Sequence, residues 1–358
     1  MTTPLPAHRT GFLSRYRMLG IVVVLGVLFP FVIGFLDGQS PAAVIASEGG
    51  NAKFMMGLAV EVFILALFAL SYDLILGITG LLSLGHMMFF GVGAYGAGIM
   101  LKSLEWSLPQ MFLGVIVLGV AQTVLFGVLL PRVQGLAFAL VTLGIGMMFW
   151  IVIQTPELSE YAGSDVGLAG ASSLVPEWIN TTDNRFRFYL LVLFALLAAY
   201  LVYRQIVASP TGAVLVANRD NPERAGMLGY NTFWFQLFAL FVSSVTAAIA
   251  GMFWAMHQPI VTPAVAGLQW MIAVLLMVIM GGIGTLTGAV VGAAAFRLLD
   301  FYLERWFGGG ATLLLGVTFI LIVLFLPYGI IGTWRAKALE RHRGWERIKG
   351  LVGSNSRA

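Results

Sequence analysis

The sequence predicts an all-α integral membrane protein with about ten transmembrane helices, and three observations lead to that prediction. Of the 358 residues, 59% are apolar and only 10% are charged, whereas a soluble domain carries about 25% charged residues. The mean hydropathy is +0.93, and apolar runs recur at the length of about 20 residues that crosses a bilayer as a helix. The 43 glycines suit packed membrane helices, because small residues let two backbones approach closely.

The apolar runs place the individual helices. Spans are predicted near residues 18–36, 55–78, 80–101, 109–130, 135–154, 187–205, 233–256 and 310–331. A further run, 264–304, is too long for one crossing and is interrupted by the Gly-rich stretch 281–288. If that stretch is a tight turn, the chain crosses ten times, and otherwise nine times. Basic residues before the first run resemble the start of a signal peptide, but the run is long for one, so we interpret it as an uncleaved first helix.

The distribution of charge favours ten crossings. With ten, both termini lie on the cytosolic side together with most of the 20 Lys and Arg residues, as the positive-inside tendency requires. Nine crossings would place the basic C-terminal tail outside. We therefore expect an N-in, C-in protein with five parts: a cytosolic segment 1–17, a transmembrane domain 18–333, an outer loop near 155–186, a cytosolic loop near 206–232 and a basic tail 334–358.

The sequence lacks the residues or motifs that several kinds of chemistry require. There is no cysteine, which excludes disulfides, thiolate catalysis and Cys-based zinc sites. The four histidines show no metal-ligand spacing, and no Gly-x-x-x-x-Gly-Lys-Ser/Thr motif for ATP occurs. No basic face with interleaved aromatic residues suggests nucleic acid. We expect neither a metal nor a cofactor on this chain and no enzymatic activity, so the energy for any active transport must come from separate subunits.

The predicted cytosolic loop contains residues that typically start and end helices. Pro210 and Gly212 mark a turn, and a short helix over 213–219 ends before Asn221, which can cap a second helix with Pro222 in its first position. Gly229 is a C-terminal stop. This pattern predicts a short, stiff helix with Glu223 and Arg224 exposed. It is either a connector in the headgroup region or a docking element for a soluble partner.

The same loop carries a family resemblance. Ser-Pro-Thr-Gly at residues 209–212, Ala-Asn-Arg-Asp-Asn at 217–221 and Ala-Gly-Met-Leu-Gly at 225–229 resemble the branched-chain amino acid permeases of ATP-binding-cassette importers. Ala213 and Asn218 depart from the family pattern, where Arg and an aliphatic residue are usual. In that family the loop helix seats in a cleft of the ATPase subunit. The resemblance therefore implies an ATPase-coupling loop that comprises Ala217, Arg219, Asp220, Asn221, Pro222, Glu223, Arg224, Ala225 and Gly229.

Three further motifs extend the resemblance over nearly the whole chain. Residues 77–95 are similar to the family's most recognisable membrane motif, and residues 281–293 to its late Gly-rich motif, with Ala289 in place of the common Pro. Residues 162–168 look like its outer Gly-Gly-x-x-Gly-Leu loop, with Ala162 in place of one glycine and altered spacing. The outer-loop candidates are Gly163, Ser164, Asp165 and Gly167.

The membrane motifs allow two interpretations, which are compatible. Each glycine in 77–98 weakens a continuous helix by up to ~1 kcal/mol relative to alanine, and loosened helices are tolerated where they line a cavity or are covered by protein. The segment either lines a solute path or packs closely against neighbours, with His86 bonded to another helix. Candidates for the path are Ser83, His86, Gly91, Gly93, Thr142, Gly282, Gly284 and Thr285.

Of the charged residues within the predicted spans, four are considered for a role. For Asp73 we expect structural hydrogen bonding, and Arg297 and Asp300 are spaced to pair on one helical face. The role of Glu61 stays open.

The resemblance implies an assembly in the inner membrane. Its expected partners are a second, related permease, two cytosolic ATP-binding subunits and an extracytoplasmic solute-binding protein. Branched-chain amino acids are the family's usual solutes, and urea or short amides are alternatives because related urea permeases share the Gly-rich motifs. A secondary transporter is the alternative from another class, but it would need a midplane acid and inverted repeats, of which the sequence shows no convincing sign.

Overall fold

The computed structural model describes residues 12–326 and 328–334, and most of them are helical. The N-terminal segment before Phe12 and nearly all of the predicted basic tail lie outside the described residues. Two compact units form within the chain. The first comprises the described part of Met1–Val60 and Glu177–Leu193, and the second comprises Glu61–Pro176 and the described part of Phe194–Ala358.

The first unit is small and is held by hydrogen bonds to main-chain carbonyls. It contains α1 (Phe12–Leu36), α2 (Pro41–Ile45), the start of α3 (Gly50–Asp73), η5 (Glu177–Ile179) and the start of α8 (Arg185–Ala208). The Tyr189 hydroxyl donates to the Gly26 carbonyl at 2.6 Å, and Arg185 Nη1 donates to the Lys53 carbonyl at 3.0 Å. The start of α8 thereby fastens both α1 and α3.

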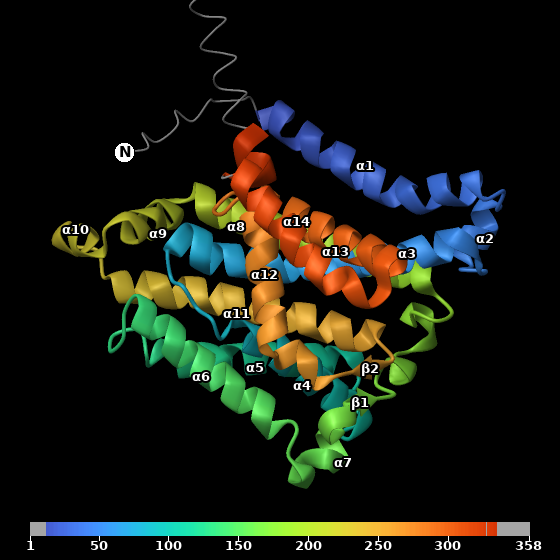
Figure 1. The fold of residues 1–358 in the computed structure, drawn as a ribbon, viewed down its shortest axis with the longest axis horizontal. Helices are drawn as coiled ribbons and strands as arrows, with labels where there is room; N and C mark the ends of the chain where they lie inside the picture. The colour runs from blue at the N-terminus through green and yellow to red at the C-terminus, as the bar shows by residue number, and fades with distance from the viewer. Residues whose placement is uncertain (1–11, 327, 335–358) are drawn as a thin grey trace, which may run out of the picture. The chain divides into compact units, whose positions relative to one another are not determined.

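The second unit holds the remaining helices (Figure 1). In chain order the longer ones are the end of α3, α4 (His86–Lys102), α5 (Leu108–Gly127), α6 (Leu136–Val152), the end of α8, α9 (Pro210–Asp220), α10 (Pro222–Met227), α11 (Thr232–His257), α12 (Leu268–Gly281), α13 (Thr287–Phe307) and α14 (Ala311–Phe325). The π-helix η1 (Leu74–Thr79) continues α3. Shorter elements are η2 (Pro156–Leu158), α7 (Ser159–Ala162), η3 (Ser164–Val166), β1 (Leu168–Ala169), η4 (Ser172–Leu174), β2 (Ile260–Val261), η6 (Pro263–Ala266) and η7 (Gly308–Gly310).

Helix α11 forms the centre of this unit because small residues let it approach α4 and α5. A side chain at Gly93 would collide with the Ala248 backbone, and one at Gly251 would collide with the Phe90 carbonyl. The hydroxyls of Thr123 and Ser244 hydrogen-bond at 2.6 Å between α5 and α11. Close packing, one of the two interpretations of the Gly-rich motif, is therefore confirmed for Gly93.

Every predicted span contains a helix. The long apolar run divides into α12 and α13 at residues 282–286, and Gly292 of α13 lies directly against the Met277 carbonyl of α12. Within the described residues, five stretches are long and apolar enough to cross a membrane: Pro41–Thr79, Leu108–Gly127, Arg185–Ala208, Thr232–His257 and Thr287–Trp334. A sixth joins α6 to Pro156–Ala162 through a bend of 64°. The protein is thus an all-α membrane protein, while ten crossings and the N-in, C-in orientation stay predictions.

Two segments of the second unit lie at opposite ends of α11. The α9–α10 segment leads into the first residue of α11, and β2 follows its last residue (Figure 1). Twenty-six residues at 1.5 Å each make α11 about 39 Å long, comparable to a bilayer with its interfacial regions. Strand β2 pairs with β1, with Leu168 opposite Val261, so the 155–176 segment belongs to the far end from α9 and α10.

Candidate functional site

The segment 209–230 consists of two short, capped helices. The Ser209 hydroxyl accepts from the Gly212 N–H at 3.4 Å at the start of α9, and Asn221 Oδ1 accepts from the Arg224 N–H at 2.9 Å at the start of α10. Pro222 stands in the first turn of α10, and Gly229 adopts φ 89° just after it. The predicted cap at Asn221 and the glycine after the second helix are confirmed.

Helix α10 leaves its apolar residues uncovered within this chain. Its buried side chain is Ala225, whereas Met227 is 86% exposed and Leu228 after it is 71% exposed. A side chain built at Gly226 would meet nothing within 4 Å. Glu223 and Arg224 are exposed, as predicted. The end of the segment is therefore a stiff surface with apolar side chains that the chain itself does not cover.

Helix α9, by contrast, is anchored to the rest of the unit. Val214, Leu215 and Asn218 are buried. Arg219 Nη1 donates to the Gly77 carbonyl in η1 at 2.6 Å, while its other nitrogens lie 3.2 Å from Asp220 Oδ1. Gly80, at φ 79°, leaves the room that the Arg219 side chain fills. One of the predicted coupling residues is thus tied directly to a predicted membrane motif.

That membrane motif is a broken helix, as its glycines predict. The π-helix η1 ends at Thr79, Gly80 follows it in a left-handed conformation, and α4 begins only at His86. Main-chain groups in the break have no partner within a helix, so within a membrane they need a hydrogen-bond partner from elsewhere in the protein. Thr142 of α6 supplies one, because its hydroxyl accepts from the Leu84 N–H at 3.2 Å. The same residue's carbonyl lies where a side chain at Gly85 would go.

Asp73 joins the two Gly-rich motifs. Its carboxylate is fully buried and accepts from the Gly284 N–H at 2.6 Å and from the Leu286 N–H at 2.9 Å. Gly282, Gly284 and Leu286 all have positive φ. A turn of this kind directs successive N–H groups toward one anion, and Asp73 supplies that anion. Structural hydrogen bonding by Asp73 is confirmed.

Thr285 closes the same turn from within. Its hydroxyl donates to the Gly282 carbonyl at 2.6 Å and accepts from the Gly288 N–H at 3.1 Å. Three of the predicted path residues, Gly282, Gly284 and Thr285, therefore shape the turn that Asp73 holds. Their role in a solute path stays a prediction.

The other candidates for the solute path lie inside the chain. Ser83, His86 and Thr142 are fully buried. His86 Nε2 is 2.8 Å from the Ser71 hydroxyl of α3, and its ring stacks on Phe68. Gly91 lies against Ala266. The hydrogen bond between His86 and Ser71 of α3 confirms the packing interpretation for His86. Contact of these residues with a solute stays a prediction.

Glu61, whose role the sequence analysis left open, lies in a cluster of ion pairs. Glu61 Oε2 lies 2.6 Å from both Arg297 Nε and Nη2. Glu61 Oε1 accepts from Gln258 Nε2 at 3.1 Å. Arg297 Nη1 also pairs with Asp300 at 2.9 Å, which confirms the predicted pair. The Glu61 charge is therefore balanced by an arginine 236 residues away, which the local sequence does not indicate.

One of the four predicted outer-loop residues, Asp165, lines a cavity of about 380 Å³. The Ser164 hydroxyl donates to the Gln154 carbonyl at 2.8 Å, and Gly163 and Gly167 have φ 77° and 89°. The Tyr95 hydroxyl donates to the Val261 carbonyl at 3.1 Å and steadies β2. The cavity is lined by Met147, Trp150, Gln154, Asp165, Thr262, Pro263, Ala264, Gly267, Leu268 and Gln269. Residues 262–269 complete the site, and no sequence motif had indicated them.

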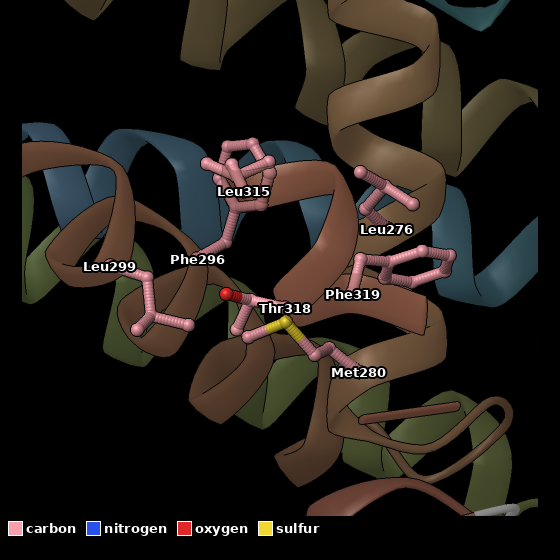
Figure 2. A pocket seen from close by; sticks show the side chains of 7 residues that line it. All are labelled: Leu276, Met280, Phe296, Leu299, Leu315, Thr318 and Phe319. Atoms are coloured by element: carbon pink, nitrogen blue, oxygen red, sulfur yellow. The ribbon is translucent and has the colours of Figure 1, made fainter. Parts of the chain in front are cut away.

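A second cavity, between α12, α13 and α14, is a packing gap. Figure 2 shows its seven lining side chains: Leu276, Met280, Phe296, Leu299, Leu315, Thr318 and Phe319. Its volume is about 10 Å³, room for about one water molecule. Among residues 12–326 and 328–334, no group of three or more His, Asp or Glu side chains is arranged to hold a metal ion.

These features define a multi-pass helical membrane protein. The sequence model of the family described as "Branched-chain amino acid transport system / permease component" matches residues 54–326, and the chain belongs to this family.

Named relatives agree with that membership. The high-affinity branched-chain amino acid transport system permease protein LivM of Salmonella typhimurium is 24% identical over 353 residues, covering 91% of this chain and 77% of the relative. The corresponding protein BraD of Pseudomonas aeruginosa is 22% identical over 280 residues, 75% of this chain and 91% of that protein. No solved structure matches the chain.

Proposed function

We propose that this chain is a permease subunit of an ATP-binding-cassette importer that carries branched-chain amino acids across the inner membrane. It works with a second permease, two ATP-binding subunits and a solute-binding protein. Family membership supports the transport role, and the names of the relatives supply the solute class. The structural observation that supports coupling of this chain to ATP-binding subunits is the exposed apolar end of the capped 209–230 segment.

The form of that segment suits transmission of movement. Two caps, at Ser209 and Asn221, stiffen it, and α9 is anchored to the membrane helices through Arg219. The exposed Met227 and Leu228 offer apolar area to a partner, and burial of such area is the main favourable term in association.

Isolation of the native assembly tests the proposal. The chain is extracted gently from its membranes, co-purifying proteins are identified by mass spectrometry, and the assembly is placed in vesicles for uptake assays. We expect an ATPase, a second permease and ATP-dependent uptake of leucine, isoleucine or valine. ATP-dependent uptake of urea or a short amide instead would reassign the solute. Uptake by this chain alone without ATP would contradict the proposal and favour a secondary transporter.

A bulky residue at Gly226 is expected to separate the chain from its ATPase. A Cβ atom at Gly226 meets nothing within 4 Å, so we expect Gly226→Phe to leave the chain's own packing unchanged while it obstructs any partner seated on α10. We expect co-purified ATPase and uptake to fall at least tenfold, the factor that about 1.4 kcal/mol produces. Gly229→Asp is a poorer choice, because φ 89° there already disfavours a side chain.

Gly309→Phe is the matched control for Gly226→Phe. Gly309, in η7, also has open space around it, but it lies outside the 209–230 segment. We expect this variant to retain ATPase and uptake. Normal ATPase recovery with Gly226→Phe would rule out α10 as the docking element.

The cavity beside Asp165 is proposed as the place where the solute enters. Its volume of about 380 Å³ lies within the usual range for small-molecule sites, about 300–1,000 Å³. Asp165 offers a carboxylate to an ammonium group, while Trp150 and Leu268 offer apolar surface to an aliphatic side chain.

Removal of the Asp165 charge therefore has a measurable consequence. A hydrogen bond to a charged group contributes about 1.5–3 kcal/mol, so Asp165→Asn is expected to reduce uptake about tenfold at limiting solute. Glu160→Gln removes an exposed carboxylate from the same segment and is expected to have no effect. Equal uptake by the Asp165→Asn variant and the wild type would exclude this cavity as the entry site.

A further inference from the structure

Three separate parts of the chain meet at the guanidinium of Arg219. Helix α9 contributes Arg219, the π-helix η1 contributes the Gly77 carbonyl, and the α12–α13 turn contributes Gly284. Arg219 Nη1 is 2.6 Å from the Gly77 oxygen, and it lies 3.5 Å from where a side chain at Gly284 would begin. We name the group of Asp73, Gly77, Gly80, Arg219 and Gly284 the Arg219 junction.

The Arg219 junction has no room for a Cβ atom at Gly77 or at Gly80. A side chain at Gly77 would collide with the Asp73 carboxylate and with the backbone of Gly284, and one at Gly80 would collide with Arg219. The three backbones approach so closely because these positions are glycine. The Arg219 side chain therefore links α9 to η1 and to the turn at close range.

Polar bonds continue the connection beyond Arg219. Asp73 stands at the end of α3, one residue before η1, and it interacts electrostatically with Arg219. Its two carboxylate oxygens hold Gly284 and Leu286 of the turn. Charge-assisted hydrogen bonds thus join α9 to η1 through Arg219, and join the end of α3, directly before η1, to the α12–α13 turn through Asp73. Such contacts are shorter, stronger and more directional than neutral hydrogen bonds.

The π-helix is the element in this set that is best suited to change shape. π-helices are rare, occur mostly as single turns inside α-helices, and are frequent at functional sites. Here η1 spans six residues and passes directly into the non-helical stretch that begins at Gly80. Transmission between distant sites needs an element with two arrangements that both sites bias, and η1 is placed where α9 can bias it.

We propose that Arg219 is the positioning residue through which movement of the 209–230 segment reaches the membrane helices, with η1 and the α12–α13 turn as the parts that respond. This inference rests on the proposed function, because the movement is that imposed by ATP-binding subunits on the segment. Arg219 acts through the Gly77 carbonyl.

The test measures coupling as a ratio. The complete importer is reconstituted in vesicles, and solute uptake and ATP hydrolysis are measured in the same samples. Arg219→Ala is expected to retain the ATPase subunits and hydrolysis within twofold of wild type, while uptake per ATP falls at least tenfold. Arg219→Lys, whose ammonium is a single point donor without the fork of arginine, is expected to recover part of the ratio.

Arg132→Ala is the matched control. Arg132 is an exposed arginine in the connection between α5 and α6, outside the coupling loop and the junction, and the ratio is expected to stay at the wild-type value. A wild-type ratio with Arg219→Ala would overturn the inference. Loss of the ATPase subunits in that variant would also overturn it, because Arg219 would then be a docking residue. Failure of the proposed function looks different, since wild type itself would then show no ATP-dependent uptake.

Hydrogen exchange supplies a second readout that a purely structural role would not affect. In wild type, a non-hydrolysable ATP analogue is expected to change amide protection at residues 209–230, 74–80 and 282–286. In Arg219→Ala the change at 209–230 should persist, while those at 74–80 and 282–286 disappear. An unchanged response at all three segments would contradict transmission through Arg219.

Discussion

Asp73→Leu is expected to destabilise the second unit strongly. It leaves the N–H groups of Gly284 and Leu286 without the acceptor that they have now. Each hydrogen bond to a charged group contributes about 1.5–3 kcal/mol, so the loss of two costs about 3–6 kcal/mol. Asp73→Asn keeps one oxygen acceptor, and we expect an intermediate loss.

Thermal unfolding of the purified protein in detergent measures this effect. The expected order of melting temperatures is wild type, then Asp73→Asn, then Asp73→Leu. Asp183→Leu removes an exposed carboxylate outside the helices and is expected to melt close to wild type. If Asp73→Leu melted with that control, the carboxylate would not be holding the 282–286 turn.

The second large effect concerns the ion pair between α3 and α13. Arg297→Met leaves Glu61 without its arginine, and the two side chains are only 16% and 20% exposed. Removal of one partner of a buried pair costs about 3–5 kcal/mol, because a buried charge is left uncompensated. Residual exposure places the expected loss at the lower end of that range. Glu61→Gln is expected to cost less, since Arg297 keeps Asp300.

A double-mutant cycle separates the pair from its surroundings. Replacement of both partners by apolar residues is often neutral or stabilising, so Glu61→Leu with Arg297→Met should melt at a higher temperature than Arg297→Met alone. The cycle compares the melting temperatures of wild type, Glu61→Leu, Arg297→Met and the double variant. Additive losses would show that Glu61 and Arg297 do not interact.

The local features that the sequence predicted correctly all depend on neighbouring residues. Apolar runs predicted the helices because a bilayer selects segments by length and hydrophobicity. Asn221, Pro222 and Gly229 predicted the limits of α10, because a cap satisfies main-chain groups a few residues away. The glycines of 77–98 predicted a broken helix, and the break lies at residues 80–85.

Contacts between distant segments were not predictable in this way. The sequence favoured structural hydrogen bonding for Asp73 but offered no means of choosing Gly284 and Leu286, 211 and 213 residues away. It proposed Arg219 for coupling from a resemblance, without indicating that this side chain would reach Gly77. Asp165 was a candidate, but Thr262 and Gln269, which share its cavity, carried no local signal.

By itself, the sequence determined an all-α membrane protein, the positions of its helices, the caps of its stiff loop and a family that the comparisons then established. Tertiary structure alone decided which residues meet: Arg219 with Gly77, Asp73 with the 282–286 turn, and Glu61 with Arg297. The physical reason is the range of the interactions. Hydrophobicity, propensity and capping act within a few residues, whereas these contacts form only when packed helices bring together polar groups that must be paired away from water.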